Sequence, residues 1–208
     1  MSDARLREEI CRIGTSLFAR GYTHGASGNI SVRREDGCFL VTPTNVSLGR
    51  LDPAALSVLD PMGRLIDGPP PTKEVPLHSA IYATRRSSGA VIHLHSTHSV
   101  AVSMLPDIDP HDVFPPLTAY YLMRVGRTAL IPYFRPGDPA VADALKSLDG
   151  AYGAILLANH GPVIADASLE AAGWAIEELE QTARLTLLLR GERPRLIEAE
   201  EAGSLRGR

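Results

Sequence analysis

The sequence predicts an α/β domain built in layers, because helical and strand patterns alternate along the chain. Apolar residues recur at helical spacing near both ends, over residues 3–20 and 169–187. Between these two helices lie short apolar or alternating stretches bounded by Gly, Pro, Asn and Asp, which are typical of β-strands. Strands framed by helices in this way favour a sheet covered by helices.

The first half of the chain is expected to hold one long helix, two strand pairs and two shorter helices. The helix over 3–20 ends at Gly21, and Gly37 lies in the turn of the first hairpin. After that helix, the expected elements are strands 29–32 and 39–42, strands 56–59 and 64–66, a helix over 76–85, a strand over 90–95 and a helix over 97–104.

The second half begins with an irregular segment, 106–116, which is rich in Pro and Asp. The elements expected after it are a strand at 129–131, a helix over 138–147, strands 153–158 and 162–165, and a final helix between Ser168 and Gly191. The charged tail 192–208 is expected to be loose. With no repeat and no internal boundary, residues 1–208 are expected to form a single domain.

Composition narrows the class of protein and of partner. The 208 residues are 44% hydrophobic and 22% charged, with a formal net charge of −3, as in an ordinary globular protein. The scattered basic residues predict no nucleic-acid partner, and the absence of a long apolar run or leader predicts no membrane span and no signal peptide. Cys11 and Cys38 form neither a metal-type pair nor a disulfide framework, which favours a cytoplasmic location.

The run His93-Leu94-His95 is the most informative motif, because it places two imidazoles two residues apart at the end of an apolar stretch. Side chains at i and i+2 of a strand point to the same face, with roots roughly 6–7 Å apart. Two imidazoles so placed can converge on one cation at about 2.0–2.1 Å per Zn–N bond. The alternative is a pair of hydrogen-bonded histidines in a half-buried strand.

His160 and Glu74 strengthen the metal interpretation. His160 follows the apolar run 154–157 and precedes Gly161-Pro162, so it is expected where a strand ends in a sharp turn. Glu74 follows a Gly/Pro-rich stretch and just precedes Pro76, a plausible first residue of a helix. Three neutral imidazoles and one carboxylate fill a tetrahedral divalent site, and a carboxylate that swings off the metal becomes a base.

A divalent cation beside a carboxylate suits reactions that pass through an enediolate. The metal acts as a Lewis acid on a carbonyl oxygen, and the carboxylate moves a proton at the adjacent carbon. Hydrolysis by metal-activated water is the generic alternative. A phosphate site would favour the first chemistry, because phosphate anchors small sugar-like substrates.

Three polar loops are candidates for binding phosphate. They are Ser27-Gly28-Asn29, Thr42-Pro43-Thr44-Asn45 and Thr72-Lys73. The first resembles anion-binding turns, and the last lies at an expected helix N-terminus, where free N–H groups and a cation favour an anion. The alternative in each case is an ordinary polar turn, with Lys73 a solvated surface lysine.

The chain resembles the class II aldolase/adducin family over nearly its whole length. The motifs that carry the resemblance are Ser27-Gly28-Asn29, Thr42-Pro43-Thr44, Thr72-Lys73-Glu74, His93-Leu94-His95 and Asn159-His160-Gly161. The resemblance implies a three-layer α/β/α sandwich and a C4-like homotetramer. It also implies one Zn²⁺ per chain on Glu74, His93, His95 and His160, with Mn²⁺ or Co²⁺ as substitutes, and phosphate binding by Gly28, Asn29, Thr44, Thr72 and Lys73.

Within that family, the local sequence around Ser27, Arg50, Lys73 and Tyr120-Tyr121 is most similar to that of the 3-oxo-tetronate 4-phosphate decarboxylases. Family aldolases carry two serines where Thr72 and Lys73 stand, and epimerases carry Asp in place of Glu74. The resemblance therefore implies a metal-dependent carboxy-lyase that converts 3-oxo-tetronate 4-phosphate to dihydroxyacetone phosphate and CO₂. The alternatives are an aldolase that cleaves a ketose or sugar-acid phosphate, and a non-catalytic adducin-like interaction module.

Five further side chains have less specific patterns. Tyr121 falls where the aldolases carry a proton-donating tyrosine, and its alternative is a packed aromatic residue. Arg124 and His24 are candidates for binding the substrate carboxylate. His98 is expected to support or cap rather than to bind metal. His78 lies one helical turn beyond Glu74 and could orient it, but a plain surface histidine is favoured.

Overall fold

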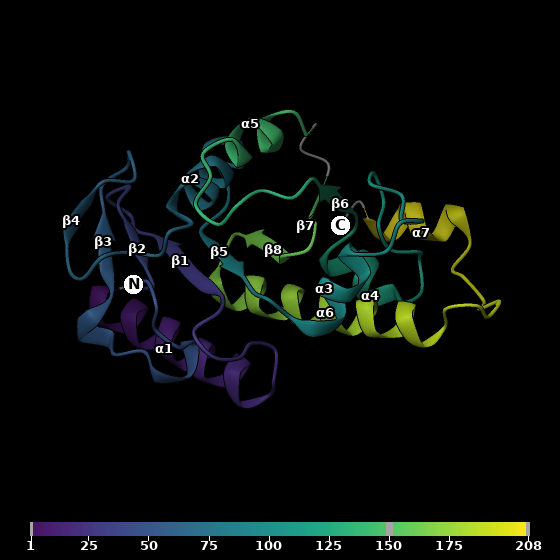
Figure 1. Ribbon diagram of the computed structural model, residues 1–208, viewed down its shortest axis with the longest axis horizontal. Coiled ribbons are helices and arrows are strands. Elements are labelled where there is room, and N and C mark those ends of the chain that lie inside the picture. The colour runs from purple at the N-terminus through teal and green to yellow at the C-terminus, as the bar shows by residue number, and fades with distance from the viewer. Residues whose placement is uncertain (1, 149–151, 207–208) are drawn as a thin grey trace.

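Eight strands form one sheet, in the order β4-β3-β2-β1-β5-β8-β7-β6, in a computed structural model that describes residues 2–148 and 152–206 (Figure 1). All neighbouring strands are antiparallel except β6 and β7, which are parallel. The strands are β1 Asn29–Arg33, β2 Phe39–Val41, β3 Ser57–Leu59, β4 Leu65–Asp67, β5 Ala90–His93, β6 Thr128–Ile131, β7 Ala154–Leu157 and β8 Gly161–Asp166.

Helices cover both faces of the sheet, which confirms the predicted three-layer α/β/α arrangement. They are α1 Asp3–Ala19, α2 Val75–Thr84, α3 Thr97–Ser103, α4 Ala119–Arg124, α5 Val141–Lys146, α6 Leu169–Leu188 and α7 Ala199–Arg206, with short 3₁₀ turns at Leu48–Arg50 and Pro53–Ala55. In Figure 1, α2 and α5 lie together on the upper side of the sheet, and α1, α3, α4 and α6 lie below it.

Two hydrophobic clusters fill the spaces between the three layers. One cluster joins the sheet to the layer of α1, α3, α4 and α6, and includes Ile10, Ile92 and Ile176. The other joins the sheet to α2 and α5, and includes Val91 and Ile81. Neighbouring residues of β5 thus face opposite clusters, as the two-residue period of a strand requires. Odd-numbered positions of β5 therefore face α2 and α5.

Most of the predicted elements are confirmed, with boundaries shifted by a few residues. The final helix begins after Ser168, whose side chain accepts a hydrogen bond from the N–H of Ala171, as predicted for an N-cap. The strand predicted over 90–95 ends at His93, so His95 lies beyond it. Helix α4 was not predicted, because its six residues are too few to show a helical period.

The C-terminal tail corrects one expectation. Residues 199–206 form α7, which packs against α4. Its Ala202 is buried in the core, and Arg206 forms an ion pair with Asp112 at 2.9 Å. A segment that buries apolar side chains and pairs its charge is held in place, so this part of the tail is ordered against the domain.

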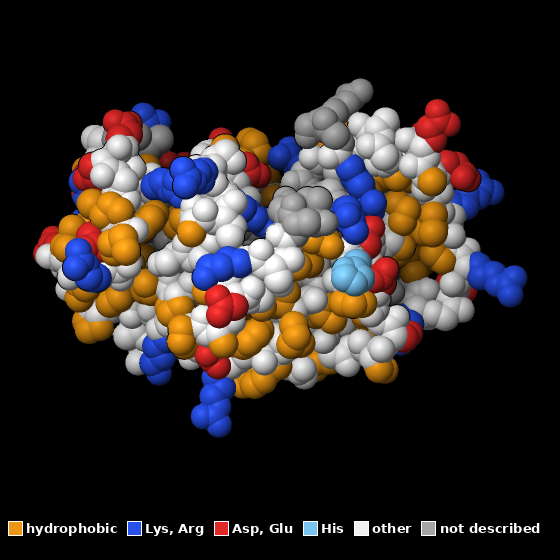
Figure 2. Space-filling model, turned by 90° about the horizontal axis from the view of Figure 1, so that it is seen from above, with side chains coloured by type: hydrophobic (Ala, Val, Ile, Leu, Met, Phe, Trp, Pro, Cys, Tyr) orange, Lys and Arg blue, Asp and Glu red, His pale blue; other side chains and the backbone are white. Residues whose placement is uncertain are grey.

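Charge on one face of the molecule is dispersed. Figure 2 shows the face that α2 and α5 cover, where basic side chains stand in small groups between hydrophobic and acidic ones. Among the described residues, every helix is too short or too polar to cross a membrane.

Candidate metal centre

The end of β5 aims His93 into the layer of α2. His93 follows the alternation of the strand, so it shares the face of Val91, toward α2 and α5. Its side chain is fully buried. The ring Nδ1–H donates a hydrogen bond of 2.9 Å to the carbonyl oxygen of Pro162 on β8, which leaves Nε2 as the free ligand atom.

His160 reaches the same place from a tight turn between β7 and β8. The turn requires unusual backbone, since Asn159 has φ 58°. Gly161 lies so close to the end of β5 that a Cβ built on it would stand 2.1 Å from the carbonyl oxygen of Leu94 and 3.2 Å from the Cα of His95. Only glycine allows this approach, and the approach brings His160 beside His95.

Glu74 is the residue immediately before α2, and Pro76 lies in the first turn of that helix. The backbone N–H of Glu74 donates to the hydroxyl of Thr72 at 3.3 Å. The carboxylate is 7% exposed and accepts a 2.9 Å hydrogen bond from the Asn29 side-chain amide through Oε2. The start of the helix is thereby fixed with its carboxylate pointing at the histidines.

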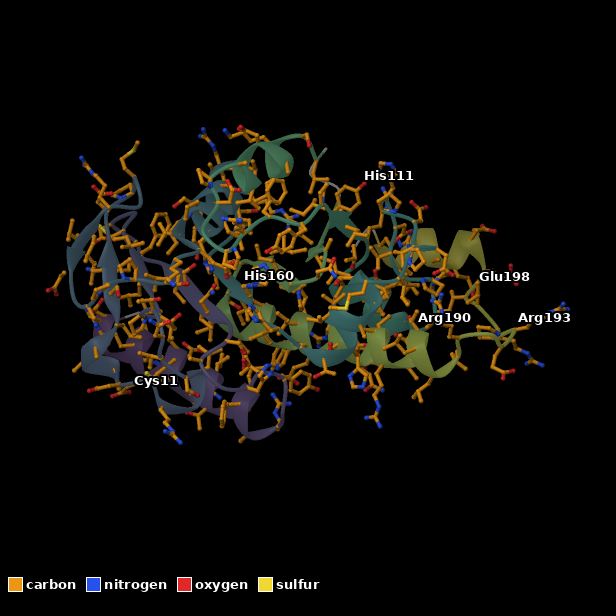
Figure 3. The ribbon with its side chains drawn as sticks, in the orientation of Figure 1. Cys11, His111, His160, Arg190, Arg193 and Glu198 are labelled. Atoms are coloured by element: carbon orange, nitrogen blue, oxygen red, sulfur yellow. The ribbon has the colours of Figure 1, made fainter. Side chains whose placement is uncertain are left out.

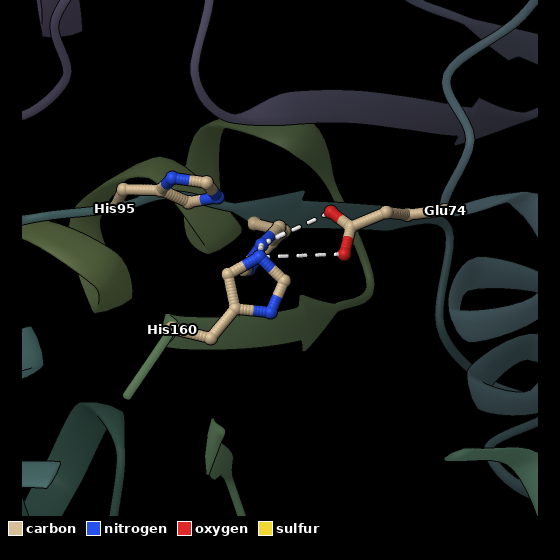
Figure 4. Close-up of side chains that lie close together, drawn as sticks. Glu74, His95 and His160 are labelled. Atoms are coloured by element: carbon tan, nitrogen blue, oxygen red, sulfur yellow. Dashed lines mark hydrogen bonds and ion pairs between the residues drawn. The ribbon is translucent and has the colours of Figure 1, made fainter. Parts of the chain in front are cut away.

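Glu74, His93, His95 and His160 converge, as predicted (Figure 4). Their ligand atoms all lie within 4.8 Å of one another. The Nε2 atom of His93 lies 3.1 Å from Glu74 Oε2 and 3.4 Å from His160 Nε2, and Glu74 Oε1 lies 3.5 Å from His160 Nε2. In a tetrahedron with bonds near 2.05 Å, neighbouring ligand atoms are about 3.3–3.4 Å apart. The cluster therefore fits one divalent cation.

Electrostatics hold Glu74 ionised and keep His95 and His160 neutral. Burial and the neighbouring histidines lower the pKa of His95 to about 3, and burial and His93 lower that of His160 to about 4, so both rings are neutral at pH 7. Burial opposes ionisation of Glu74, but His93, Asn29 and His160 outweigh it and hold its pKa well below the usual range. Burial likewise opposes protonation of His93, but Glu74 raises its pKa on balance. A carboxylate and neutral imidazoles are the forms that bind metal.

The three predicted phosphate loops lie around this cluster in two groups. Gly28 packs against the end of β5, where an added Cβ would stand 3.0 Å from the His93 carbonyl oxygen. The second and third loops are joined, because Thr72 N–H donates to the Thr42 carbonyl at 3.1 Å and Thr44 N–H donates to the Pro70 carbonyl at 3.0 Å. Backbone hydrogen bonds therefore hold the loop of Thr44 beside the loop of Thr72, which leads directly into Glu74.

The side chains of these loops differ in whether they still have a hydrogen-bond donor for an anion. The hydroxyl of Ser27 donates to the His24 carbonyl oxygen at 2.6 Å, so it braces its own loop. The carbonyl oxygen and one N–H of the Asn29 amide are used by His78 and Glu74, so only one amide N–H of Asn29 is left for an anion. Lys73 is exposed.

Tyr121 is a packed core residue, which corrects the proton-donor interpretation. Its side chain is 0% exposed, its hydroxyl shares a 3.0 Å hydrogen bond with Thr128 on β6, and its ring packs edge-on against Phe114. Burial raises the pKa of the phenol well above its usual value. A hydroxyl enclosed in this way cannot reach a substrate, so the packed aromatic alternative holds.

Arg124 is not brought to the cluster either. Its guanidinium lies over the rings of Trp174 and Tyr120, at 4.9 and 6.0 Å, and lines a separate surface hollow beside α6. His24 is exposed on the loop 23–28.

The structure gives specific contacts to two histidines with less specific sequence patterns, and it places one arginine that the sequence did not single out. His78 is 3% exposed and hydrogen-bonded within the core, so it is not the expected surface histidine. His98 donates to Glu180 through its backbone N–H and its ring, so Glu180 caps the start of α3 and the imidazole is bound to it. Arg135 lines a small hollow together with Glu74 and His160, although the sequence pattern gave no sign of it. Figure 3 shows His160 near the middle of the long axis, well inside the molecule.

Comparison with known proteins identifies the family. Residues 8–187 match the model of the Class II Aldolase and Adducin N-terminal domain. The chain belongs to this family. A "3-oxo-tetronate 4-phosphate decarboxylase" of Cupriavidus necator is 49% identical over 91% of the chain and 87% of that protein. Another of Haemophilus influenzae is 44% identical over 100% of the chain and 99% of that protein.

Solved structures of the family have the same fold. YgbL of Klebsiella pneumoniae, whose description leaves aldolase, epimerase and decarboxylase open, superposes with a TM-score of 0.95. It is 46% identical, and the match covers 99% of this chain and all of that one. The fold-class prediction is therefore confirmed, together with the family resemblance.

Proposed function

We propose that the protein is a metal-dependent carboxy-lyase that converts 3-oxo-tetronate 4-phosphate to dihydroxyacetone phosphate and CO₂. The observation that carries the proposal is the buried set of Glu74, His93, His95 and His160 in a family member this similar to decarboxylases. A non-catalytic module would have no use for four convergent ligands. The intact set therefore favours an enzyme over an adducin-like interaction module.

The side chains divide the work of decarboxylation between them. His93, His95 and His160 would hold the cation, which supplies Lewis-acid stabilisation of the negative charge that builds on the substrate oxygens. When the C1–C2 bond breaks, CO₂ leaves with C1, the electron pair stays with the three-carbon fragment, and the former C2 must then take up a proton. Glu74 is the carboxylate of the metal cluster, so we assign it the transfer of that proton from water to the carbon.

The outer parts of the site would position the substrate. Backbone N–H groups and side chains of Ser27, Gly28, Asn29, Thr44, Thr72 and Lys73 are the proposed phosphate contacts. His24 remains the proposed contact for the carboxylate, and Arg124 is withdrawn from that role. Zn²⁺ is the proposed metal, because three imidazoles and a carboxylate suit it, with Mn²⁺ or Co²⁺ as substitutes.

The proposed assembly is a homotetramer located in the cytoplasm. Large apolar side chains lie exposed on α4 and α6, among them Tyr120, Met123 and Trp174. Side chains of this kind are enriched where subunits meet, which supports association of copies. Light scattering of the purified protein tests it, and a monomer at micromolar concentration would contradict it.

The substrate assignment is tested by product analysis. Zn²⁺-loaded protein incubated with 3-oxo-tetronate 4-phosphate should release dihydroxyacetone phosphate and CO₂ in equal amounts, because one bond cleavage yields both. Metal-free protein is the control and should release neither. Cleavage of L-fuculose 1-phosphate, with no CO₂ from the oxo acid, would instead establish the aldolase alternative.

Replacement of Lys73 by methionine tests the phosphate site. The exposed ammonium group is proposed to bind the phosphate, so Lys73→Met should weaken binding of the phosphorylated substrate by roughly 1.5–3 kcal/mol, seen as a higher KM. Turnover of the same acid without phosphate should hardly change. Lys146→Met, on the exposed side of α5, is the matched control. Equal losses with both substrates would place Lys73 at the metal or the carboxylate instead.

A further inference from the structure

A line of buried polar side chains runs between α2 and β1, in a layer where apolar contacts would be expected. Glu74, His78 and Tyr82 recur every fourth residue and so share one face of the helix. Asn29 and Ser31 are two residues apart on β1 and share one face of the strand. All five are buried. We call them the polar seam.

Hydrogen bonds link the polar seam from end to end, crossing between strand and helix at each step. Asn29 joins Glu74 at 2.9 Å and His78 at 2.5 Å, and Ser31 joins His78 at 2.6 Å and Tyr82 at 2.9 Å. One end is the carboxylate of the metal cluster. At the other end, the ring of Tyr82 stacks on Phe39. The polar seam is thus anchored in the core at Tyr82 and reaches the metal cluster at Glu74.

The directions of the hydrogen bonds in the polar seam follow from the charge of Glu74 together with a neutral His78 ring. A carboxylate only accepts, so Asn29 must present its NH₂ group to Glu74 and its carbonyl oxygen to His78. His78 must then donate through Nε2–H, and its Nδ1 accepts from the hydroxyl of Ser31. The Ser31 oxygen accepts in turn from the hydroxyl of Tyr82.

We propose that Asn29 and His78 are positioning residues, which fix the amide that holds the Glu74 carboxylate in the orientation needed for proton transfer. His78 keeps the Asn29 amide from turning over, because a reversed amide would set its NH₂ group against the Nε2–H of His78, donor facing donor. The ring of His78 is buried, and the hydrogen-bond partners of its two nitrogens are uncharged groups of Asn29 and Ser31, which favours the neutral ring with a single N–H to place.

A purely structural role explains the polar seam less well. Apolar side chains of similar size would fill the same layer without the desolvation that buried polar groups incur. The neighbouring residues Leu77 and Ile81 on α2 show that this helix does pack on the sheet through apolar groups. A fully linked polar line that ends on a reactive carboxylate is what supporting shells of metal sites have in common.

The tautomer of His78 is the first test. In ¹⁵N NMR of histidine-labelled protein, with the His78 signals assigned by their loss in His78→Gln, we expect a neutral ring protonated at Nε2. This readout needs neither substrate nor turnover. A ring protonated at Nδ1 would overturn the deduced direction of the hydrogen bonds, and with it the proposal.

Two substitutions of similar size separate positioning from packing. His78→Leu removes the N–H that holds Asn29, whereas His78→Gln keeps an amide N–H in that region. If both fold, as judged by circular dichroism and thermal unfolding, we expect kcat to fall about 10–100-fold in His78→Leu, the usual effect of losing a supporting hydrogen bond at a metal site. KM should change little, and His78→Gln should recover most of the lost kcat.

This second test rests on the proposed decarboxylation, so zinc affinity is measured beside it by chelator competition. Weaker zinc binding in His78→Leu than in His78→Gln supports positioning of Glu74 even if the substrate has been misassigned. Equal kcat and equal zinc affinity in the two variants would overturn the proposal. If His78→Leu does not fold, Ser31→Ala takes its place. We then expect mixed tautomers and a lower kcat, and mixed tautomers with unchanged kcat would overturn the proposal.

Discussion

Replacement of His95 by alanine should abolish both metal binding and turnover while leaving the fold intact. The loss of one of four ligands removes the Lewis acid from its site, and a contribution of about 4 kcal/mol from that metal corresponds to a roughly 10³-fold fall in kcat. Wild-type protein should hold close to one divalent ion per chain, and His95→Ala far less. Elemental analysis and the CO₂-release assay measure the two effects.

The fold should survive because His95 lies beyond the last residue of β5. The strand is held by Val91 and Ile92, which pack into the two hydrophobic clusters, and neither depends on the imidazole. His111→Ala, at an exposed histidine, is the matched control and should keep metal and activity. Full activity in His95→Ala would mean that the site has been assigned wrongly.

The sequence predicted the three layers well, because the main helices and strands have clear patterns of apolar residues. The apolar stripes of α1 and α6 repeat with the helical period over several turns. The strands β5 and β7 are short continuous apolar runs. Helix α4 was missed, since six residues cannot establish a period. The tail was called loose because its charge is visible in the sequence, whereas the contact of α7 with α4 is not.

The metal ligands could be predicted, but the network that supports them could not, since the sequence favoured a surface position for His78. His93, His95 and His160 are rare residue types at the ends of apolar runs, and Glu74 precedes a proline-marked helix start. Tyr121 was misassigned because spacing along the chain does not tell whether a tyrosine points into the core. The link between His78 and Asn29 joins residues 49 positions apart, and only the pairing of α2 with β1 brings them together.

Replacement of Glu74 by glutamine should separate proton transfer from metal binding. Glutamine keeps the shape of the side chain and one oxygen, so the three histidines should still retain the metal. The amide can neither take up nor deliver the proton that Glu74 is proposed to transfer, and we expect kcat to fall on the order of 10²–10⁴-fold, the usual range for general acid–base catalysis. Metal content and CO₂ release are measured on the same preparation.

The neighbours of Glu74 sharpen this expectation. In the wild type, Oε2 faces the Asn29 amide and His93, and Oε1 faces His160. An amide has only one oxygen, so in Glu74→Gln the NH₂ group must face either Asn29 and His93 or His160. Glu74→Asp keeps two oxygens on a shorter arm, and should lose less kcat than Glu74→Gln if proton transfer is the deficit. Near-normal turnover in Glu74→Gln would assign the proton to water, because Tyr121 is enclosed in the core.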